Sequence, residues 1–184
     1  MSLQTWQETL ITATADGPAL TAAAAASCIN TAAKITLPNN FFQIGKMIKI
    51  TMHGRISCAV TTPGTARFDI RLGAVVAHDS GAMNLNVVAK TNVPFIYECI
   101  LTCRSIGSGT LATLMGQGQF SSEAIVGAPL PTVGGSGSLN CPVAAPAVGT
   151  GFDSTSALTL DVFFTQTVAT GSLTVHQYKV ESLN

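Results

Sequence analysis

Apolar and polar residues alternate along much of this chain, a pattern typical of β-strands that bury one face. Between residues 48 and 58 the apolar set is Ile48, Ile50, Met52, Ile56 and Cys58, and the intervening positions are polar. Successive side chains of a strand point to opposite faces, so this period of two predicts one core-facing and one outward-facing row.

The alternation recurs and predicts further strands. Those segments are residues 66–72, Phe95–Arg104, Leu111–Val126, Leu158–Thr165 and Leu173–Leu183. The segment Phe95–Arg104 is apolar on much of both faces. The segment Leu111–Val126 is weaker and is interrupted at Gly116 and Gly118, which suggests a bulge or a bend.

Turn residues separate two pairs of these strands. Thr62–Gly64 follows the strand at 48–58, and Ala169–Gly171 lies between the last two strands. Short turns between alternating segments are typical of antiparallel hairpins, so we expect one hairpin at each turn.

The N-terminal part is expected to be extended. Thr5–Thr14 alternates and predicts an N-terminal strand, and residues 1–14 could form a strand or an arm. Ala22–Ala26 has high helix propensity, but its Thr-rich flanks and the absence of an amphipathic stripe favour an extended segment. About eight strands and scarce helix predict an all-β protein: one antiparallel, jelly-roll-like β-sandwich domain spanning residues 1–184.

One segment departs from this composition. Gly127–Gly151 holds ten Gly or Pro among its 25 residues and interrupts a series of strands, so it is an insertion within one domain. Structureless loops of this length are uncommon unless they are functional or disordered. It is therefore either a loose loop or an arm that becomes ordered against a neighbour. Its apolar residues favour the arm: Leu130, Val133, Leu139, Val143 and Val148.

The charge content changes the picture of the surface. Of 184 residues, 47% are hydrophobic and 10% charged, and nine basic and nine acidic side chains cancel. Soluble domains carry about 25% charged residues. This composition argues against disorder and, without a basic surplus, against non-specific nucleic-acid binding. No membrane span or signal peptide is evident, and the chain is expected to be made and to remain in the cytosol.

A neutral surface of this kind favours permanent association, and we expect a homo-oligomer. Two aromatic residues occupy outward-facing strand positions: Trp6 shares a strand face with Glu8, and Phe163 lies among polar neighbours. Each is either part of a second core or an anchor at an interface, where aromatic residues are enriched.

Candidate chemistry is sparse. Five cysteines lack a framework spacing and are expected to be reduced, buried thiols. Asp69 and Asp161 could bind a cation if they converged, but a solvated or salt-bridged face near Arg67 and Arg71 is the simpler interpretation. The histidines have polar neighbours, and His78 lies in an expected turn. We therefore expect no catalytic site, no metal and no cofactor.

Several stretches resemble small β-rich virion proteins of tailed bacteriophages. They are Trp6–Ile11, Thr62–Gly64, Arg71–Gly73 at the end of the following strand, Gly149–Asp153, and the terminal Val175–Asn184. The resemblance implies a trimeric jelly roll of the tumour-necrosis-factor type. It also implies a capsid decoration (cement) protein on the outside of the shell, bridging neighbouring major capsid subunits. It supplies no catalytic residues.

Two alternatives stay open. The chain could be a phage tail or fibre-associated protein that binds a receptor, although 6% aromatic residues is low for such a surface. It could also be a non-viral carbohydrate-binding sandwich or an enzyme, which would require acidic groups or histidines to converge in one cleft.

Overall fold

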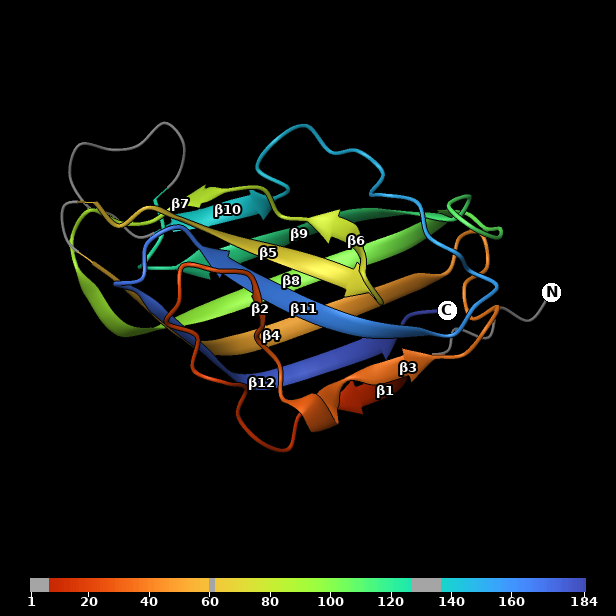
Figure 1. The fold of residues 1–184 in the computed structure, drawn as a ribbon, viewed down its shortest axis with the longest axis horizontal. Coiled ribbons are helices and arrows are strands. Elements are labelled where there is room, and N and C mark those ends of the chain that lie inside the picture. Colours follow the sequence, from red (N-terminus) through yellow and green to blue (C-terminus); the bar gives the residue numbers. More distant parts are fainter. Residues whose placement is uncertain (1–6, 60–61, 127–136) are drawn as a thin grey trace.

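A computed structural model describes residues 7–59, 62–126 and 137–184, and in these ranges the chain forms two packed antiparallel sheets (Figure 1). The larger sheet has the order β1 (Glu8–Thr12), β12 (Ser172–Ser182), β4 (Met47–Cys58), β8 (Lys90–Ser105), β9 (Thr113–Ser122), β10 (Gly137–Cys141). The smaller sheet has the order β2 (Ala26–Ser27), β11 (Leu158–Gln166), β5 (Thr65–Leu72), β6 (Val75–Asp79). Two further strands are added to it: β3 (Ile35–Leu37) on β11 and β7 (Met83–Asn84) on β5.

The predicted all-β sandwich is confirmed, with more strands than expected. The described residues form twelve strands rather than about eight. The strands β6 and β10, five residues each, were not predicted, and neither were β2, β3 and β7, which are only two or three residues long. Such short pieces carry no detectable alternation. The 3-10 turn Thr31–Ala33 is capped by Asn30, whose side chain accepts from the N–H of Ala32.

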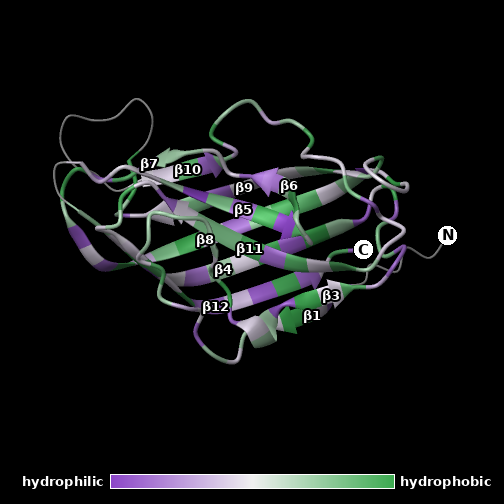
Figure 2. Ribbon diagram, in the orientation of Figure 1, coloured by the Kyte–Doolittle hydropathy of each residue, from purple (hydrophilic) through white to green (hydrophobic). Residues whose placement is uncertain are grey.

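The core lies between the two sheets, and the alternation identified the residues that enter it. The apolar rows of β4 and β5 are buried, including Ile50 and Met52 in β4 and Phe68 and Ile70 in β5, each 0% exposed. Figure 2 shows the resulting bands of hydrophobic and hydrophilic residues along the strands. Phe68 forms the centre of an aromatic cluster that joins the sheets and also contains Phe95, Tyr97, Phe120 and Phe164.

Both predicted hairpins are wrong. β4 and β5, on either side of Thr62–Gly64, lie in different sheets, and so do β11 and β12, on either side of Ala169–Gly171. β12 pairs with β4 and β1, whereas β11 pairs with β5, β2 and β3. Alternation shows which face of a strand is buried. In a sandwich the inner faces of both sheets pack on the same core, so alternation does not show in which sheet the strand pairs.

Of the bulge or bend expected at Gly116 and Gly118, the bulge is wrong. The pairing of β8 and β9 is regular across both glycines, and its irregularity lies between Cys103 and Ser105. Gly116 instead faces the imidazole of His78 from the opposite sheet, so closely that a Cβ at this position would collide with the ring. The glycine makes room for a side chain, and the β8–β9 ladder stays regular at this position.

The remaining local expectations have mixed outcomes. Glu8–Thr12 forms the expected N-terminal strand, and Ala22–Ala26 contains no helix. Of the insertion Gly127–Gly151, residues 127–136 lie outside the described residues. Its second part is not a loose loop, because Gly137–Cys141 forms β10, paired with β9. The N–H of Val143 donates to the carbonyl of Ser80 at 2.9 Å.

Candidate functional site

The candidate interface residues are dispersed rather than gathered into one patch. Trp6, Leu130 and Val133 lie outside the described residues. Leu139 is half-buried and packs against the core, whereas Val143 and Val148 are 44% and 51% exposed. Within the described part of the insertion, the apolar residues therefore divide between the inside and the surface of the sandwich.

Phe163 lies on the outer face of the smaller sheet, as its strand position predicted. In the ladder it pairs with Ser27 on one side and with Asp69 on the other. The guanidinium of Arg71 lies over its ring, 3.8 Å from the centroid, and Phe163 is only partly exposed. The ring is therefore partly covered by an arginine of the neighbouring strand.

Charged side chains gather around this ring. Asp69 is 0% exposed and forms ion pairs with Arg67 Nε at 3.2 Å and Arg71 at 3.1 Å. Arg67 also reaches Asp79 at 3.3 Å, and the neighbouring Asp161 forms an ion pair with Lys34 at 2.6 Å. The expected salt-bridged face is confirmed. Asp69 and Asp161 each have a cationic partner, and in the described residues no group of three His, Cys, Asp or Glu could hold a metal ion.

His78 differs from its prediction. It belongs to strand β6, not to a turn, and is 4% exposed. Its polar neighbours in the sequence were misleading because Gly116 leaves space for the ring between the sheets. Burial lowers the pKa of His78, and the nearby carboxylates of Asp79 and Asp69 partly offset this effect.

This burial predicts an acid-sensitive fold. Since the pKa of His78 is depressed in the folded state, the unfolded chain takes up the proton first as the pH falls below about 6.5. The contribution of His78 to the free energy of unfolding should therefore be fully present above that pH and decrease over the pH interval below it. Urea titrations at several pH values test this, and His78→Gln should flatten the dependence in this interval. An equally steep decrease in His78→Gln would assign it to other groups.

Two exposed isoleucines lie on the outer face of the larger sheet and were not among the predicted interface residues. Ile96 and Ile100 in β8 are 48% and 41% exposed. They are four residues apart on one face, about 13 Å at the rise of a strand. The sequence did indicate these exposed residues. Phe95–Arg104 is apolar on both faces, although the face of a strand that is open to solvent does not require apolar residues.

A third apolar region lies at one end of the sandwich, where loops meet. Leu111, Ile44 and Ile106 are 65%, 69% and 42% exposed and belong to the β8–β9 connection and the loop before β4. The loop before β4 is tied to the end of β8, since the N–H of Gly45 donates to the carbonyl of Cys103. Loop residues without periodicity gave no sequence signal for this region.

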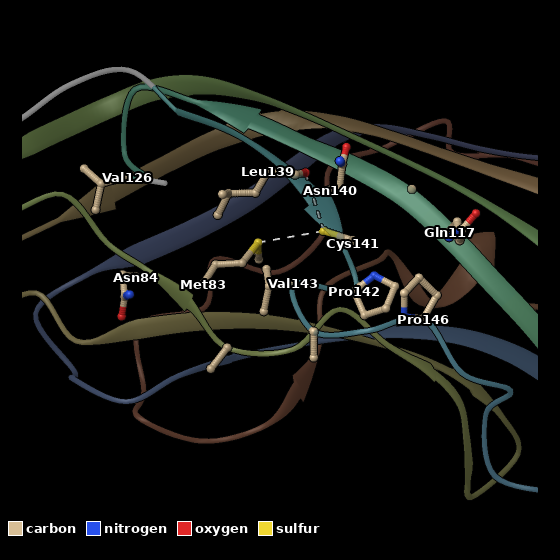
Figure 3. A pocket seen from close by; sticks show the side chains of 13 residues that line it. Met83, Asn84, Gln117, Val126, Leu139, Asn140, Cys141, Pro142, Val143 and Pro146 are labelled. Atoms are coloured by element: carbon tan, nitrogen blue, oxygen red, sulfur yellow. Dashed lines mark hydrogen bonds between the residues drawn. The ribbon is translucent and has the colours of Figure 1, made fainter. Parts of the chain in front are cut away.

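A cavity of about 640 Å³ opens on the side of the sandwich, between β9 and β10 of the larger sheet and β7 of the smaller one. Figure 3 shows the side chains of Leu139, Cys141, Met83 and Val143 around it, with the Cys141 thiol 4.0 Å from the sulfur of Met83. The other lining residues are Ala82, Asn84, Gln117, Gly118, Val126, Asn140, Pro142, Ala144 and Pro146. None of these residues is acidic or basic.

The cysteines behave as predicted. All five are free and buried. Burial raises the pKa of the Cys99 thiol to about 12 and that of Cys141 to about 11, so both stay protonated near neutral pH. In the described residues no helix has the length and apolar character needed to cross a bilayer.

No family model matches this chain, and neither does any curated protein. Among solved structures, the chain has a likeness to the CBM2 module of the evolved Dit of Lactobacillus casei BL23 phage J-1. The two are 11% identical, with a TM-score of 0.28, over 82% of this chain and 69% of that one. At that level the function has to be argued from the surfaces of this chain itself.

Proposed function

We propose that this chain is a structural virion protein of a tailed bacteriophage. It would act as a homotrimeric decoration protein that binds the outside of the capsid and bridges neighbouring major capsid subunits. The observation that carries the proposal is the uncovered outer face of the larger sheet, where Ile96 and Ile100 are exposed on either side of Glu98 and its ion pair with Lys49. The stretches that resemble phage virion proteins supply the biological setting.

The distribution of charge supports a contact role. At least six of the nine acidic side chains form ion pairs with Lys or Arg of the same chain: Asp69, Asp79, Glu98, Glu123, Asp161 and Glu181. Few charges are left to steer a partner from a distance or to repel another copy. Association would then depend on complementary apolar and neutral polar area.

A decoration protein needs these properties and no catalytic chemistry. Packaged DNA pushes the shell outward, and a clamp that buries area on two neighbouring subunits opposes their separation. Each additional 1.4 kcal/mol strengthens binding tenfold. Three copies in one trimer add avidity when the geometry allows all of them to bind at once.

The oligomeric state provides the first test. We expect native mass spectrometry of the purified protein to give three times the 18.9 kDa of one chain. A double variant, Ile96→Lys with Ile100→Lys, should be monomeric with an unchanged melting temperature, because both side chains are already exposed in the monomer. Leu111→Lys, 65% exposed at the end of the sandwich, is the matched control and should stay trimeric.

Binding to shells provides the second test. Purified protein added to bare expanded shells should give density over the whole shell in negative-stain images. Density at the tail alone would favour the receptor-binding alternative. A monomer that persists at high concentration and leaves shells bare would overturn the proposal.

A further inference from the structure

The side of the sandwich next to β10 is open, and its boundaries are well defined. At one end, the opening between the two sheets is bounded by an isolated β-bridge between Leu85 and Ile125. On the other side it is closed by the segment after β10, fixed by the hydrogen bond from Val143 to Ser80. Between these two crossings the inner faces of both sheets are reached through the cavity of about 640 Å³.

Strand β10 forms the rim of this cavity and is an edge strand. Among the described residues it pairs with β9 on one side and with no strand on the other. It is a regular five-residue ladder without a charged side chain, a proline or a bulge. Edge strands of this type leave backbone N–H and C=O groups available to another chain, and proteins normally protect them.

The other sheet edges show such protection. β1 carries Glu8 and has a bulge between Thr9 and Ile11. The pairing of β6 is irregular, and the backbone of Gly149 packs against the carbonyl of Ala77. β2 and β3 are two and three residues long. The contrast makes β10 the unprotected edge of the described part of the sandwich.

The chemistry of the cavity restricts what can enter. Its inner wall is formed by the apolar side chains of Met83, Leu139 and Val143, and the buried Cys141 thiol stays neutral. The other lining residues, Asn84 among them, are uncharged. A charged group would lose its hydration here without gaining an opposite charge, so the cavity favours uncharged ligands.

We propose that β10 and this cavity form a binding site for an extended, uncharged peptide segment of another polypeptide. The segment adds to the free edge of β10 as a seventh strand of the larger sheet and inserts an apolar side chain between the sheets. Backbone hydrogen bonds would provide affinity, and the cavity would select the side chain, as in other complexes formed by strand addition. The proposal does not depend on the virion role proposed above.

The dimensions of a strand fit this arrangement. An added strand lies about 4.8 Å from its neighbour, and its alternate side chains point to the same face. The side chains of Leu139 and Cys141 already point to the cavity from β10, while Ser138 and Asn140 are exposed. An incoming strand in register would thus place one row of side chains beside Leu139 and Cys141 and the other row in solvent.

A defined peptide tests the site. The probe is an acetylated and amidated octapeptide of alternating Thr and Val, compared with a version that has Glu in place of Val. We expect the Val peptide to cause saturable NMR shifts in β10 and in the cavity, and to slow the exchange of those β10 amides that face away from β9. The Glu peptide should bind about tenfold or more weakly.

Matched variants locate the binding. Val143→Lys places a charge in the cavity wall, whereas Val148→Lys places one on the same segment outside the lining residues. Both valines are about half exposed, so both variants should fold. We expect Val143→Lys to weaken binding of the Val peptide about tenfold or more and Val148→Lys to leave it unchanged.

Three outcomes would overturn the proposal. One is the absence of saturable shifts in the wild-type protein with the Val peptide. Another is that the Glu peptide binds as tightly as the Val peptide, or that both lysine variants weaken binding of the Val peptide equally. Either result would show that the cavity does not take part in recognising the peptide. The third is a wild-type oligomer that dissociates only in Val143→Lys, which would assign this edge to a second copy of the chain.

Discussion

Replacement of Phe68 by alanine is expected to lower the free energy of unfolding by about 3–5 kcal/mol. Phe68 is 0% exposed, and its ring centroid lies 4.8 Å from that of Tyr97 and 5.3 Å from those of Phe120 and Phe164. Tyr97 and Phe120 belong to the opposite sheet, so the truncation leaves a cavity where the two sheets meet. Urea denaturation measures the loss.

Phe41→Ala is the matched control for Phe68→Ala. Phe41 is half-buried, has one ring neighbour, Phe42, and is covered by Lys46. Loss of the Phe41 ring should lower the free energy of unfolding by about 1 kcal/mol. If Phe68→Ala does not fold, Phe68→Leu, with an expected cost of about 1.5 kcal/mol, keeps the comparison possible. Equal effects at positions 68 and 41 would contradict the central position of the Phe68 ring.

Asp69→Asn is expected to lower the free energy of unfolding by about 2–4 kcal/mol. The carboxylate is completely buried and lies between two guanidinium groups, those of Arg67 and Arg71. Without its charge these two cations face each other around a buried amide, and breaking a buried ion pair from one side costs about 3–5 kcal/mol. Because the arginine side chains are 41% and 22% exposed, solvent screens part of this effect.

Glu98→Gln makes the same chemical change at an exposed ion pair. Glu98 lies 3.2 Å from Lys49, and its side chain is 47% exposed. Such pairs contribute about 0–1 kcal/mol, so this variant should unfold close to the wild-type midpoint. If Asp69→Asn were as mild as Glu98→Gln, the ion pairs of Asp69 would not contribute to the stability of the sheet.

Asp69→Asn should also make the Arg71 side chain more mobile, because Arg71 loses its ion-pair partner. Arg71 both forms an ion pair with Asp69 and covers the ring of Phe163.

The sequence correctly placed Phe163 on the outward row of its strand. It could not show that a cation from the neighbouring strand would cover the ring, because Arg71 and Phe163 are far apart in the chain and meet only through the pairing of β5 with β11.

The alternation of apolar and polar residues was enough to predict the class of fold and the inward row of most strands. In β4, for example, Ile48, Ile50 and Met52 are buried as their spacing requires. A period of two results from local backbone geometry and is therefore visible in one chain. Ile96 and Ile100 of β8, which were not predicted as interface residues, were also indicated locally, because both faces of this strand are apolar.

Which strands pair, and what their edges expose, became known from the packing of the two sheets. It separated β4 from β5 and β11 from β12, buried His78 against Gly116, and left an uncharged cavity beside β10. Each of these features depends on residues from different strands, brought together by how the two sheets pack. Local periodicity does not show which distant strand is the partner. The apolar row of a strand is buried equally well in either sheet of a sandwich, because the inner faces of both sheets pack on the same core.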